Sequence, residues 1–327
     1  MKIVMLDALT VGTDVNLDRI EELGEFVKFD MSTPDEARQR LASLDADIVI
    51  ANKVPMNAYT LEMAANVKLI CLTATGYNNV DLAYTGERGI TVTNVAGYST
   101  NSVVQHTFAM MFYLVEKMRY YDDYVKSGAY ADCPIFTHFG EPFHELYGMT
   151  WGIIGLGTIG RKVAQIAESF GCNVIYYSTS GHHSDEHYRR VDFDELLAES
   201  DIISIHAPLN ENTKGLMDIN AFSRMKKSAV MINVGRGPIV VEKDLVKALN
   251  DGMIAAAGLD VLETEPVRCD NPLLDIKDSR KLLITPHSAW ATTEARQRLM
   301  DAWISGLLMP KSRNICTNCC GLSLLIR

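Results

Sequence analysis

Three ionisable side chains in the second half of the chain are of the types that can reduce a small oxo acid. They are Arg236, Glu265 and His287, and each lies shortly after an apolar segment that we predict to be a β-strand. In open α/β sheets, ligands bind beyond the carboxyl ends of the strands. An arginine can bind a planar anion through two parallel hydrogen bonds, and an imidazole can exchange a proton with a carbonyl oxygen. Together the three residues suit the reduction of a 2-oxo acid.

Each of these residues has a simpler interpretation when it is taken singly. Arg236 stands between two glycines and could form an ordinary surface ion pair. Glu265 could merely begin a proline turn, and His287 could be a turn histidine whose ring is satisfied by its neighbours. Only their joint placement at successive strand ends favours a chemical role.

A glycine-rich turn in the middle of the chain predicts a dinucleotide site. An apolar strand candidate leads into Gly155, Gly157 and Gly160, and a helical pattern follows at once. Gly155 permits the tight turn, Gly157 lets phosphates approach the backbone, and Gly160 lets the helix pack closely on the strand. The helix N-terminus adds free N–H groups and a positive dipole end. We therefore expect this turn to bind a pyrophosphate rather than to be merely structural.

The next strand candidate does not end in the acidic residue that usually binds the ribose hydroxyls of NAD. It is followed by Ser178, in a segment that runs through two more hydroxyl side chains to His182 and His183. Nothing in this segment repels a 2′-phosphate, and its hydroxyls and histidines could receive one. Arg189 and Arg190 come later, however, and the immediate loop holds no arginine or lysine. The sequence favours NAD slightly and leaves NADP open.

The elements that must position these residues are short strands alternating with helices. Strands are predicted in the first part of the chain at 3–6, 26–29, 48–51, 69–73 and 91–94. In the second part they are predicted at 151–154, 173–177, 202–206, 229–233, 255–260 and 282–285. A helix at 35–44, a long helical segment at 101–126 and a helix resuming at Thr292 complete the pattern. This alternation predicts parallel sheets covered by helices.

Composition narrows the class of protein. The chain has 327 residues, of which 47% are hydrophobic and 22% charged, and its net charge of −10 disfavours nucleic acid and anionic membranes as partners. The longest apolar run, at 108–115, is too short to cross a bilayer, and the N-terminus reads as a first strand rather than a signal peptide. Four scattered cysteines suit a reducing compartment. We expect a cytoplasmic protein without a metal site, because the cysteines at 316, 319 and 320 have no histidine nearby.

The sequence resembles the D-isomer-specific 2-hydroxyacid dehydrogenases. The resemblance covers about residues 1–298 and rests on motifs in order at 75–81, 94–100, 155–160, 206–209, 233–237, 259–266 and 285–287. The segments at 52–55 and 75–79 look closest to glycerate dehydrogenase/hydroxypyruvate reductase members. The family implies two doubly wound parallel-sheet domains, a flavodoxin-like substrate domain and a Rossmann dinucleotide-binding domain. The boundaries would place 1–100 with 288–327 in the first domain and 101–287 in the second.

The resemblance also implies roles for individual residues. His287 would be the general acid/base, Glu265 would orient its ring and favour the protonated form, and Arg236 would bind the substrate carboxylate and polarise the carbonyl. Backbone N–H groups near Gly76 and Tyr77 would bind the carboxylate from the other domain. Lys53 would add positive charge there, unless it is simply a solvated loop lysine. The cofactor would be bound by the three glycines and by Thr158, Ile159, Ser178, His206, Pro208, Thr213, Val234 and Asp260, the last through the nicotinamide carboxamide.

Two further expectations, the oligomeric state and the function, follow from the same resemblance. The protein would be a homodimer built on the dinucleotide domain, with the 101–126 helix involved. The family's C-terminal pattern is not recognisable after about Met300. The function would be hydride transfer between NAD(P) and a small D-2-hydroxy or 2-oxo acid, with glycerate/hydroxypyruvate or glyoxylate as candidates. A nucleotide-sensing regulator resembling a co-repressor, and a formate- or phosphonate-specific relative, remain as alternatives.

Overall fold

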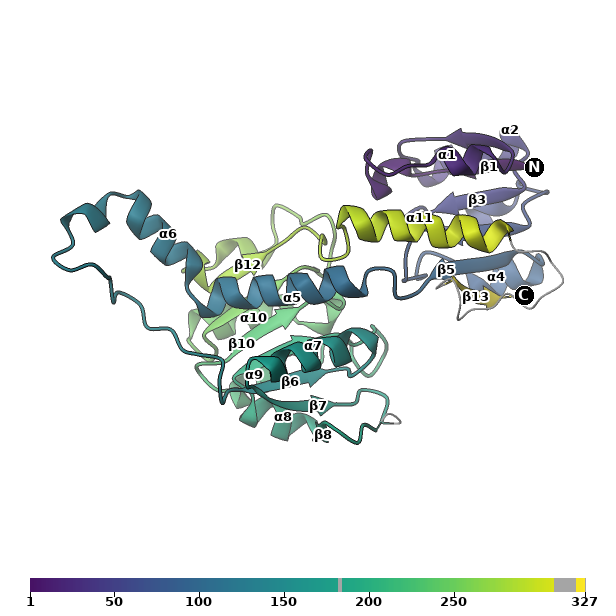
Figure 1. Ribbon diagram of the computed structural model, residues 1–327. Helices are drawn as coiled ribbons and strands as arrows, with labels where there is room; N and C mark the ends of the chain where they lie inside the picture. Colours follow the sequence, from purple (N-terminus) through teal and green to yellow (C-terminus); the bar gives the residue numbers. More distant parts are fainter. Residues whose placement is uncertain (182–183, 309–321, 327) are drawn as a thin grey trace. The chain divides into compact units, whose positions relative to one another are not determined.

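Two sheets, each flanked by helices, organise the computed structural model of the chain, which describes residues 1–181, 184–308 and 322–326 (Figure 1). The chain divides into two compact units. Unit 1 comprises Met1–Ser99 together with the described residues from Trp290 onwards, and unit 2 comprises Thr100–Ala289.

The sheet of unit 1 has the strand order β13-β5-β4-β3-β1-β2. Its strands are β1 (Lys2–Met5), β2 (Glu25–Lys28), β3 (Ile48–Ala51), β4 (Leu69–Leu72), β5 (Thr91–Val95) and β13 (Leu322–Ile326). Neighbouring strands pair in parallel, except that β13 runs antiparallel to β5. The order 2-1-3-4-5 of the first five strands is that of flavodoxin-like sheets.

Side chains alternate between the two faces of this sheet, and a helix covers each face. On β1, Val4 packs in a cluster with Ala37 and Leu41 of α2 (Pro34–Leu44). Ile3 instead packs with Trp303 of α11 (Thr293–Leu308). The two-residue period of a strand therefore divides one apolar segment between two cores. The remaining helices of unit 1 are α1 (Asp18–Glu21), α3 (Ala58–Leu61), α4 (Leu82–Glu87) and the 3₁₀ turn η1 (Ala8–Val11).

The sheet of unit 2 has the order β12-β11-β10-β9-β6-β7-β8. Its strands are β6 (Thr150–Ile154), β7 (Asn173–Tyr177), β8 (Arg189–Arg190), β9 (Ile202–Ile205), β10 (Val230–Asn233), β11 (Ala256–Leu259) and β12 (Leu282–Ile284). All pairings are parallel. Read from β8, the order 3-2-1-4-5-6 followed by a seventh strand is that of a Rossmann domain. The predicted fold class, two doubly wound parallel sheets, is confirmed.

Helices cover both faces of the second sheet and enclose two apolar clusters. They are α5 (Thr100–Val115), α6 (Met118–Lys126), α7 (Thr158–Ser169), α8 (Phe193–Glu199), α9 (Ile219–Arg224) and α10 (Glu242–Asn250), with 3₁₀ turns η2 (Ala129–Asp132), η3 (Gly237–Ile239), η4 (Pro272–Asp275) and η5 (Ser279–Lys281). Trp151 of β6 is fully buried and packs on Phe108 of α5, with ring centroids 5.0 Å apart.

One sequence expectation about helices needs correction. The predicted helical segment at 101–126 is broken into α5 and α6, because Lys117 has a left-handed backbone with φ 55°. Lysine has no particular preference for that conformation, so composition could not reveal the break. The chain also stays helical beyond Met300, since α11 ends at Leu308. The cysteines at 316, 319 and 320 lie outside the described residues, as do His182 and His183.

Candidate active site

The glycine turn between β6 and α7 has the geometry of a phosphate-binding loop. Gly155 has φ 94°, and a Cβ there would lie 2.9 Å from the backbone nitrogen of Ala207, so only glycine fits. A Cβ on Gly160 would overlap the carbonyl oxygen of Gly155. The position beside Gly157, in contrast, opens on space with no atom within 4 Å. A ligand can therefore approach the backbone at Gly157 and at no other glycine of the turn.

Helix α7 adds donors to this turn. Gly157 is its N-cap and supplies no side-chain cap, while the carbonyl of Gly157 accepts from Arg161 N at 2.9 Å. The N–H groups of the first turn, from Thr158, Ile159 and Gly160, thus have no side-chain cap as a partner. A helix of 12 residues presents a positive dipole end at this point. The turn fits a pyrophosphate.

Directly after β9, the half-buried side chain of His206 has a ring nitrogen without a partner. Trp151 Nε1 donates to Ser204 Oγ at 2.9 Å, and Ser204 Oγ lies 2.9 Å from His206 Nε2. Among the described residues, Nδ1 is buried without a hydrogen-bond partner.

Burial lowers the pKa of His206 to about 3, so the ring is neutral at physiological pH. A buried polar atom without a hydrogen-bond partner is costly unless a ligand supplies one. The cost and the open glycine turn both fit a polar dinucleotide in this domain. His206 was among the predicted cofactor residues.

Arg236 lies in a turn that the side chain of Asn233 closes. Asn233 Oδ1 accepts from Gly235 N at 3.0 Å, and its Nδ2 donates to the carbonyl of Arg236 at 3.0 Å. The Arg236 guanidinium donates to the carbonyl of Gly235 at 2.8 Å and remains half-buried. A Cβ on Gly237 would overlap the backbone of Leu262, so this turn packs against the loop that carries Glu265. Two predicted site loops are therefore in direct contact.

A hydrogen bond joins the side chains of His287 and Glu265. His287 Nδ1 lies 2.6 Å from Glu265 Oε2, and both side chains are about one-third exposed. The other carboxylate oxygen, Oε1, accepts from Leu262 N at 3.0 Å, which fixes the carboxylate on its own loop. With Nδ1 engaged, Nε2 is the ring nitrogen left to exchange a proton with a substrate.

The loop of His287 is held by the buried side chain of Asp260. Asp260 Oδ1 accepts from Ser288 N at 2.8 Å and from the Thr285 hydroxyl at 2.7 Å, and Oδ2 accepts from Ala289 N at 3.0 Å. His287 has φ 52°, and its own N–H donates to the carbonyl of Asp260 at 2.8 Å. These contacts hold a strained backbone in place. The expected hydrogen bond from a nicotinamide carboxamide to Asp260 stays a prediction. The carboxamide would have to donate to an oxygen that already accepts from the His287 loop.

Sequence reasoning missed several residues that support this corner of the sheet. Glu242 is buried, and its Oε1 accepts from Glu263 N at 2.7 Å. His106 Nε2 of α5 lies 3.0 Å from Thr285 Oγ1 and 3.5 Å from Asp260 Oδ1. Their partners come from distant parts of the sequence, so no local motif marks them.

The other predicted cofactor residues of unit 2 occupy the carboxyl side of their strands. Ser178 is buried directly after β7, and Val234 is half-buried directly after β10. The Thr213 hydroxyl donates to the carbonyl of Pro208 at 2.7 Å and accepts from Asn210 N at 2.8 Å. Thr213 thus fixes the shape of the loop after β9.

The predicted substrate residues of unit 1 lie in two loops at the carboxyl ends of β3 and β4. Lys53 is exposed, and its backbone N–H donates to Asp7 Oδ2 at 2.7 Å. Asp7 is fully buried and also accepts from the N–H groups of Asn52 and Val54. Burial raises the pKa of the Asp7 carboxyl, although these backbone N–H groups oppose the shift.

The second loop of unit 1 offers donors of the expected kind. Tyr77 is 44% exposed, and its carbonyl accepts from Val80 N at 3.0 Å. Within the part of the chain that the structure describes, the N–H groups of Gly76 and Tyr77 have no acceptor. They remain available to a carboxylate.

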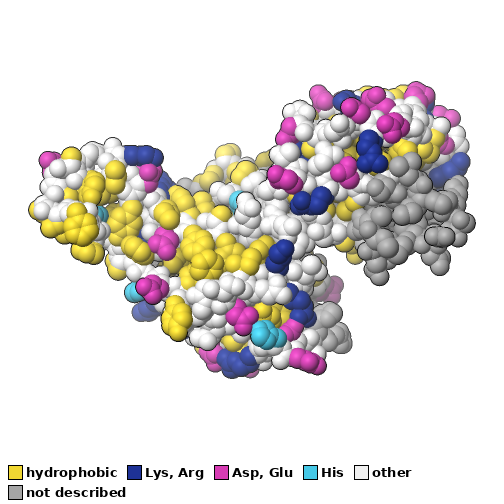
Figure 2. Space-filling view, viewed as in Figure 1, with side chains coloured by type: hydrophobic (Ala, Val, Ile, Leu, Met, Phe, Trp, Pro, Cys, Tyr) yellow, Lys and Arg dark blue, Asp and Glu magenta, His cyan; other side chains and the backbone are white. Residues whose placement is uncertain are grey.

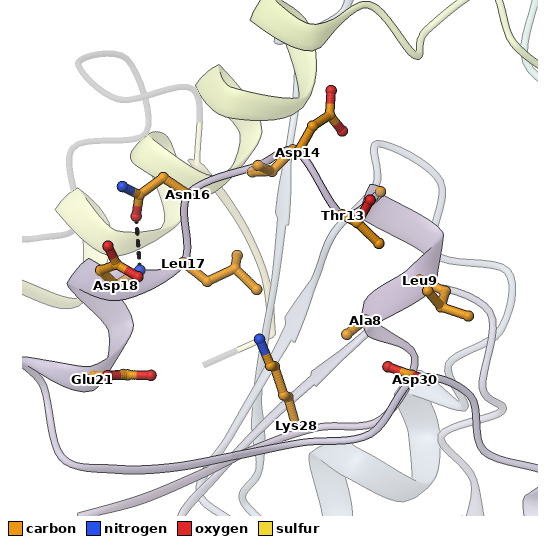
Figure 3. A pocket seen from close by; sticks show the side chains of 12 residues that line it. Ala8, Leu9, Thr13, Asp14, Asn16, Leu17, Asp18, Glu21, Lys28 and Asp30 are labelled. Atoms are coloured by element: carbon orange, nitrogen blue, oxygen red, sulfur yellow. Dashed lines mark hydrogen bonds between the residues drawn. The ribbon is translucent and has the colours of Figure 1, made fainter.

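A separate pocket of about 430 Å³ in unit 1 has the wrong charge for such a substrate (Figure 3). It is lined by Asp14, Asp18, Glu21 and Asp30, with Lys28 as its cationic side chain. Asp14 is paired with Arg296, and the other three carboxylates outnumber the single lysine. An acidic lining repels a 2-oxo acid anion, so this pocket is not a substrate site.

The described residues contain neither a metal-binding cluster nor a membrane-spanning helix. No group of three histidine, cysteine, aspartate or glutamate side chains in residues 1–181, 184–308 and 322–326 could hold a metal ion. Within the same ranges, none of the helices is long and apolar enough to cross a membrane.

Comparison with known proteins adds independent information. Residues 108–289 match the sequence profile described as D-isomer specific 2-hydroxyacid dehydrogenase, NAD binding domain. The hydroxypyruvate reductase of Blautia hydrogenotrophica is 38% identical over 311 residues, which cover 94% of this chain and 96% of that protein. The glycerate dehydrogenase of Methylorubrum extorquens is 36% identical over 307 residues, covering 94% and 95%. A solved acyclic imino acid reductase in complex with NADPH and D-Arg has a TM-score of 0.82 at 31% identity and covers 94% and 96%.

Proposed function

Because the chain belongs to the D-isomer-specific 2-hydroxyacid dehydrogenase family, we propose that it interconverts a small D-2-hydroxy acid and its 2-oxo acid, with glycerate/hydroxypyruvate or glyoxylate as substrate. The observation that carries this proposal is the His287–Glu265 hydrogen bond on the same sheet edge as Arg236, in a domain built to bind a dinucleotide. The named relatives are a reductase and a dehydrogenase of these substrates, which favours an enzyme over a nucleotide-sensing regulator.

The residues divide the work of reduction as follows. The nicotinamide, when bound, would supply a hydride to the carbonyl carbon. The residues of the chain supply binding, orientation and electrostatics. His287 gives a proton from Nε2 to the carbonyl oxygen, while Glu265 holds the ring through Nδ1 and stabilises its positive charge before transfer. Arg236 binds the carboxylate and polarises the carbonyl. In the reverse direction His287 takes the proton from the hydroxyl.

Unit 1 is proposed as the substrate-binding domain. The exposed ammonium of Lys53 and the unpaired N–H groups of Gly76 and Tyr77 suit a substrate carboxylate. The proposal assigns the whole of unit 1, closed by α11, to this role.

Kinetics of two variants test the assignment. In His287→Ala, kcat with hydroxypyruvate should fall by roughly 10²–10⁴, because the proton transfer is lost. In Arg236→Ala, kcat/KM should fall by roughly 10- to 100-fold, because a charged hydrogen bond to the carboxylate is lost. Arg224→Ala removes the same charge from an exposed pair with Asp194 and is the control.

The nucleotide affinity of both variants, measured by fluorescence titration, should stay near that of the wild type. Near-normal turnover of His287→Ala would reject the catalytic assignment. Hydroxypyruvate, glyoxylate and pyruvate should each be tried. A protein that binds nucleotide yet oxidises it with none of these acids would be a sensor rather than a dehydrogenase.

We also propose that the protein is a homodimer that pairs through unit 2. Helix α6 has no buried residue, and the segment after it exposes Phe136 at 90%, Phe139 at 83% and Tyr147 at 80%. Figure 2 shows hydrophobic side chains gathered over α6 and the segment that follows it. A nine-residue helix without buried residues is marginal in water, which supports its coverage by a second copy of the chain.

Analytical ultracentrifugation tests this arrangement. The wild type should sediment as a dimer, and Phe139→Asp should shift it to a monomer because a charge replaces an apolar contact. Met63→Asp, at an exposed apolar residue of unit 1, is the matched control and should leave the dimer intact. A wild-type monomer would refute the proposal.

A cytoplasmic location is part of the proposal. The net charge of −10 and the free thiols of Cys71 and Cys172 support a reducing compartment. Cell fractionation checks this directly.

A further inference from the structure

We propose that this chain selects NADPH over NADH, and that Arg190 binds the 2′-phosphate of the cofactor. The inference rests on the proposed function, because it concerns the cofactor of the same reaction. It differs from the slight preference for NAD that the sequence suggested.

The loop after β7 offers a phosphate no repulsion. In Rossmann domains the second strand ends beside the adenosine ribose, and a carboxylate there selects NAD. Here β7 is followed by Ser178 and Thr179, and a turn closes where Gly181 N donates to the carbonyl of Ser178 at 3.2 Å. No acidic side chain lies between Ser178 and Gly181. The carboxylate that usually excludes a 2′-phosphate is therefore absent from this segment.

The fold brings an arginine to this loop from further along the chain. Strand β8 pairs in parallel with β7 and places Arg190 opposite Tyr176, near the carboxyl end of β7 at the edge of the sheet (Figure 1). Arg190 Nη2 lies 3.9 Å from the position that a Cβ on Gly181 would take. The guanidinium thus rests beside the loop. In sequence Arg190 is nine positions after Gly181, so the spacing alone hid this approach.

The charges nearby leave Arg190 available to an anion. Arg189, on the alternate face of the strand, is engaged by Glu195 and Glu199. Among the described residues, no carboxylate forms an ion pair with Arg190.

The nearest acid in the same loop is also neutralised. Asp185 pairs with Arg161 and accepts from the N–H groups of His187 and Tyr188 at 2.9 and 3.0 Å. An unpaired guanidinium beside hydroxyl side chains is what a phosphate monoester requires. Positions 182 and 183 lie outside the described residues.

Isothermal titration of the full-length protein with two adenosine nucleotides tests the inference without any turnover. Adenosine 2′,5′-bisphosphate should bind at least about tenfold more tightly than ADP, because a charged hydrogen bond to the phosphate contributes that much. The preference should weaken as salt is raised, since the contact is exposed and electrostatic. NADPH and NADH should show the same ratio.

Variants assign the effect to one side chain. Arg190→Ala should reduce affinity for adenosine 2′,5′-bisphosphate by about 10- to 100-fold and leave ADP unchanged. Arg189→Ala removes an equal charge from the neighbouring position and should preserve the preference. Ser178→Asp should reverse it in favour of ADP and NADH. Together these variants separate a specific contact from the general charge of the edge strand.

Each outcome decides between the two proposals. Tighter binding of ADP and NADH, with hydroxypyruvate reduced normally, would overturn the inference and leave the proposed function standing. A wild-type preference that survives in Arg190→Ala would overturn the role of Arg190. If none of the four nucleotides binds, the dinucleotide site fails and the proposed function fails with it.

Discussion

The loops of Lys53 and His287, one in each unit, are each fixed by a buried aspartate that accepts hydrogen bonds from the loop backbone. Asp7 follows β1 and accepts N–H groups from the loop after β3, the neighbouring parallel strand. Asp260 follows β11 and accepts N–H groups from the loop after β12, again the neighbouring strand. Both aspartates are buried. A carboxylate at one strand end thus orders the irregular backbone at the next.

The two loops differ in the further contacts that support them. Asp7 receives three consecutive backbone N–H groups and no side chain. Asp260 also receives the Thr285 hydroxyl, which His106 of α5 approaches in turn. The His287 loop is therefore held from several elements. This suits an imidazole that must meet one atom of the substrate, whereas an ammonium such as Lys53 acts through its charge over a longer range.

The largest effect expected from this comparison is that of Asp260→Asn. The amide nitrogen cannot accept the hydrogen bonds that one carboxylate oxygen receives, so the His287 loop loses its fixed position. We expect kcat with hydroxypyruvate to fall by about 10- to 100-fold. Asp275→Asn, at an exposed aspartate of η4, is the control. An unaltered kcat would show that the loop is fixed without Asp260.

A smaller effect is expected from Asp7→Asn. Because Asp7 acts only through the Lys53 loop, KM for the 2-oxo acid should rise by roughly three- to tenfold while kcat stays within about twofold. Lys53→Met should have a similar effect, and the double variant should be no worse than either single one. Additive losses in the double variant would contradict this comparison, because they would show that Asp7 affects KM independently of Lys53.

The smallest effect concerns stability against pH. Burial raises the pKa of Asp7 above its ordinary value of 3.8, so the folded state binds a proton more readily than the unfolded state. Stability from this group is therefore complete below about pH 3.8 and is lost as pH rises through the higher folded-state pKa. The advantage of the wild type over Asp7→Asn in urea unfolding should grow as pH is lowered from 7 towards 4.

Asp14 provides a control of opposite sign. Its pKa is lowered to about 2 by hydrogen bonds from Arg296, so its contribution is present above pH 3.8 and is lost between about pH 3.8 and 2. The advantage of the wild type over Asp14→Asn should therefore shrink in that lower window. A parallel pH profile for the two variants would contradict the assignment of Asp7 as a buried carboxyl.

Much of this architecture is readable from the sequence because its signals are local. The apolar runs predict the strands at 48–51 and 173–177 with the observed bounds, and the glycine turn predicts the start of α7. The support for His287 was not readable, because Asp260, Thr285 and His106 meet only once β11, β12 and α5 are packed. The approach of Arg190 to Gly181 was hidden for the same reason, since it depends on a two-residue edge strand.

The position of α11 in unit 1 has a consequence for the order of folding during synthesis. The core of unit 1 includes Leu299, Met300 and Trp303, which leave the ribosome long after β1 to β5. Unit 2 is one continuous segment, Thr100–Ala289, with every strand of its sheet inside it. Unit 2 can therefore complete its core while unit 1 still exposes one face of its sheet, so the domain that begins first finishes last. A chain ended at Ala289 should protect the amides of β6 to β12, and not those of β1, from hydrogen exchange.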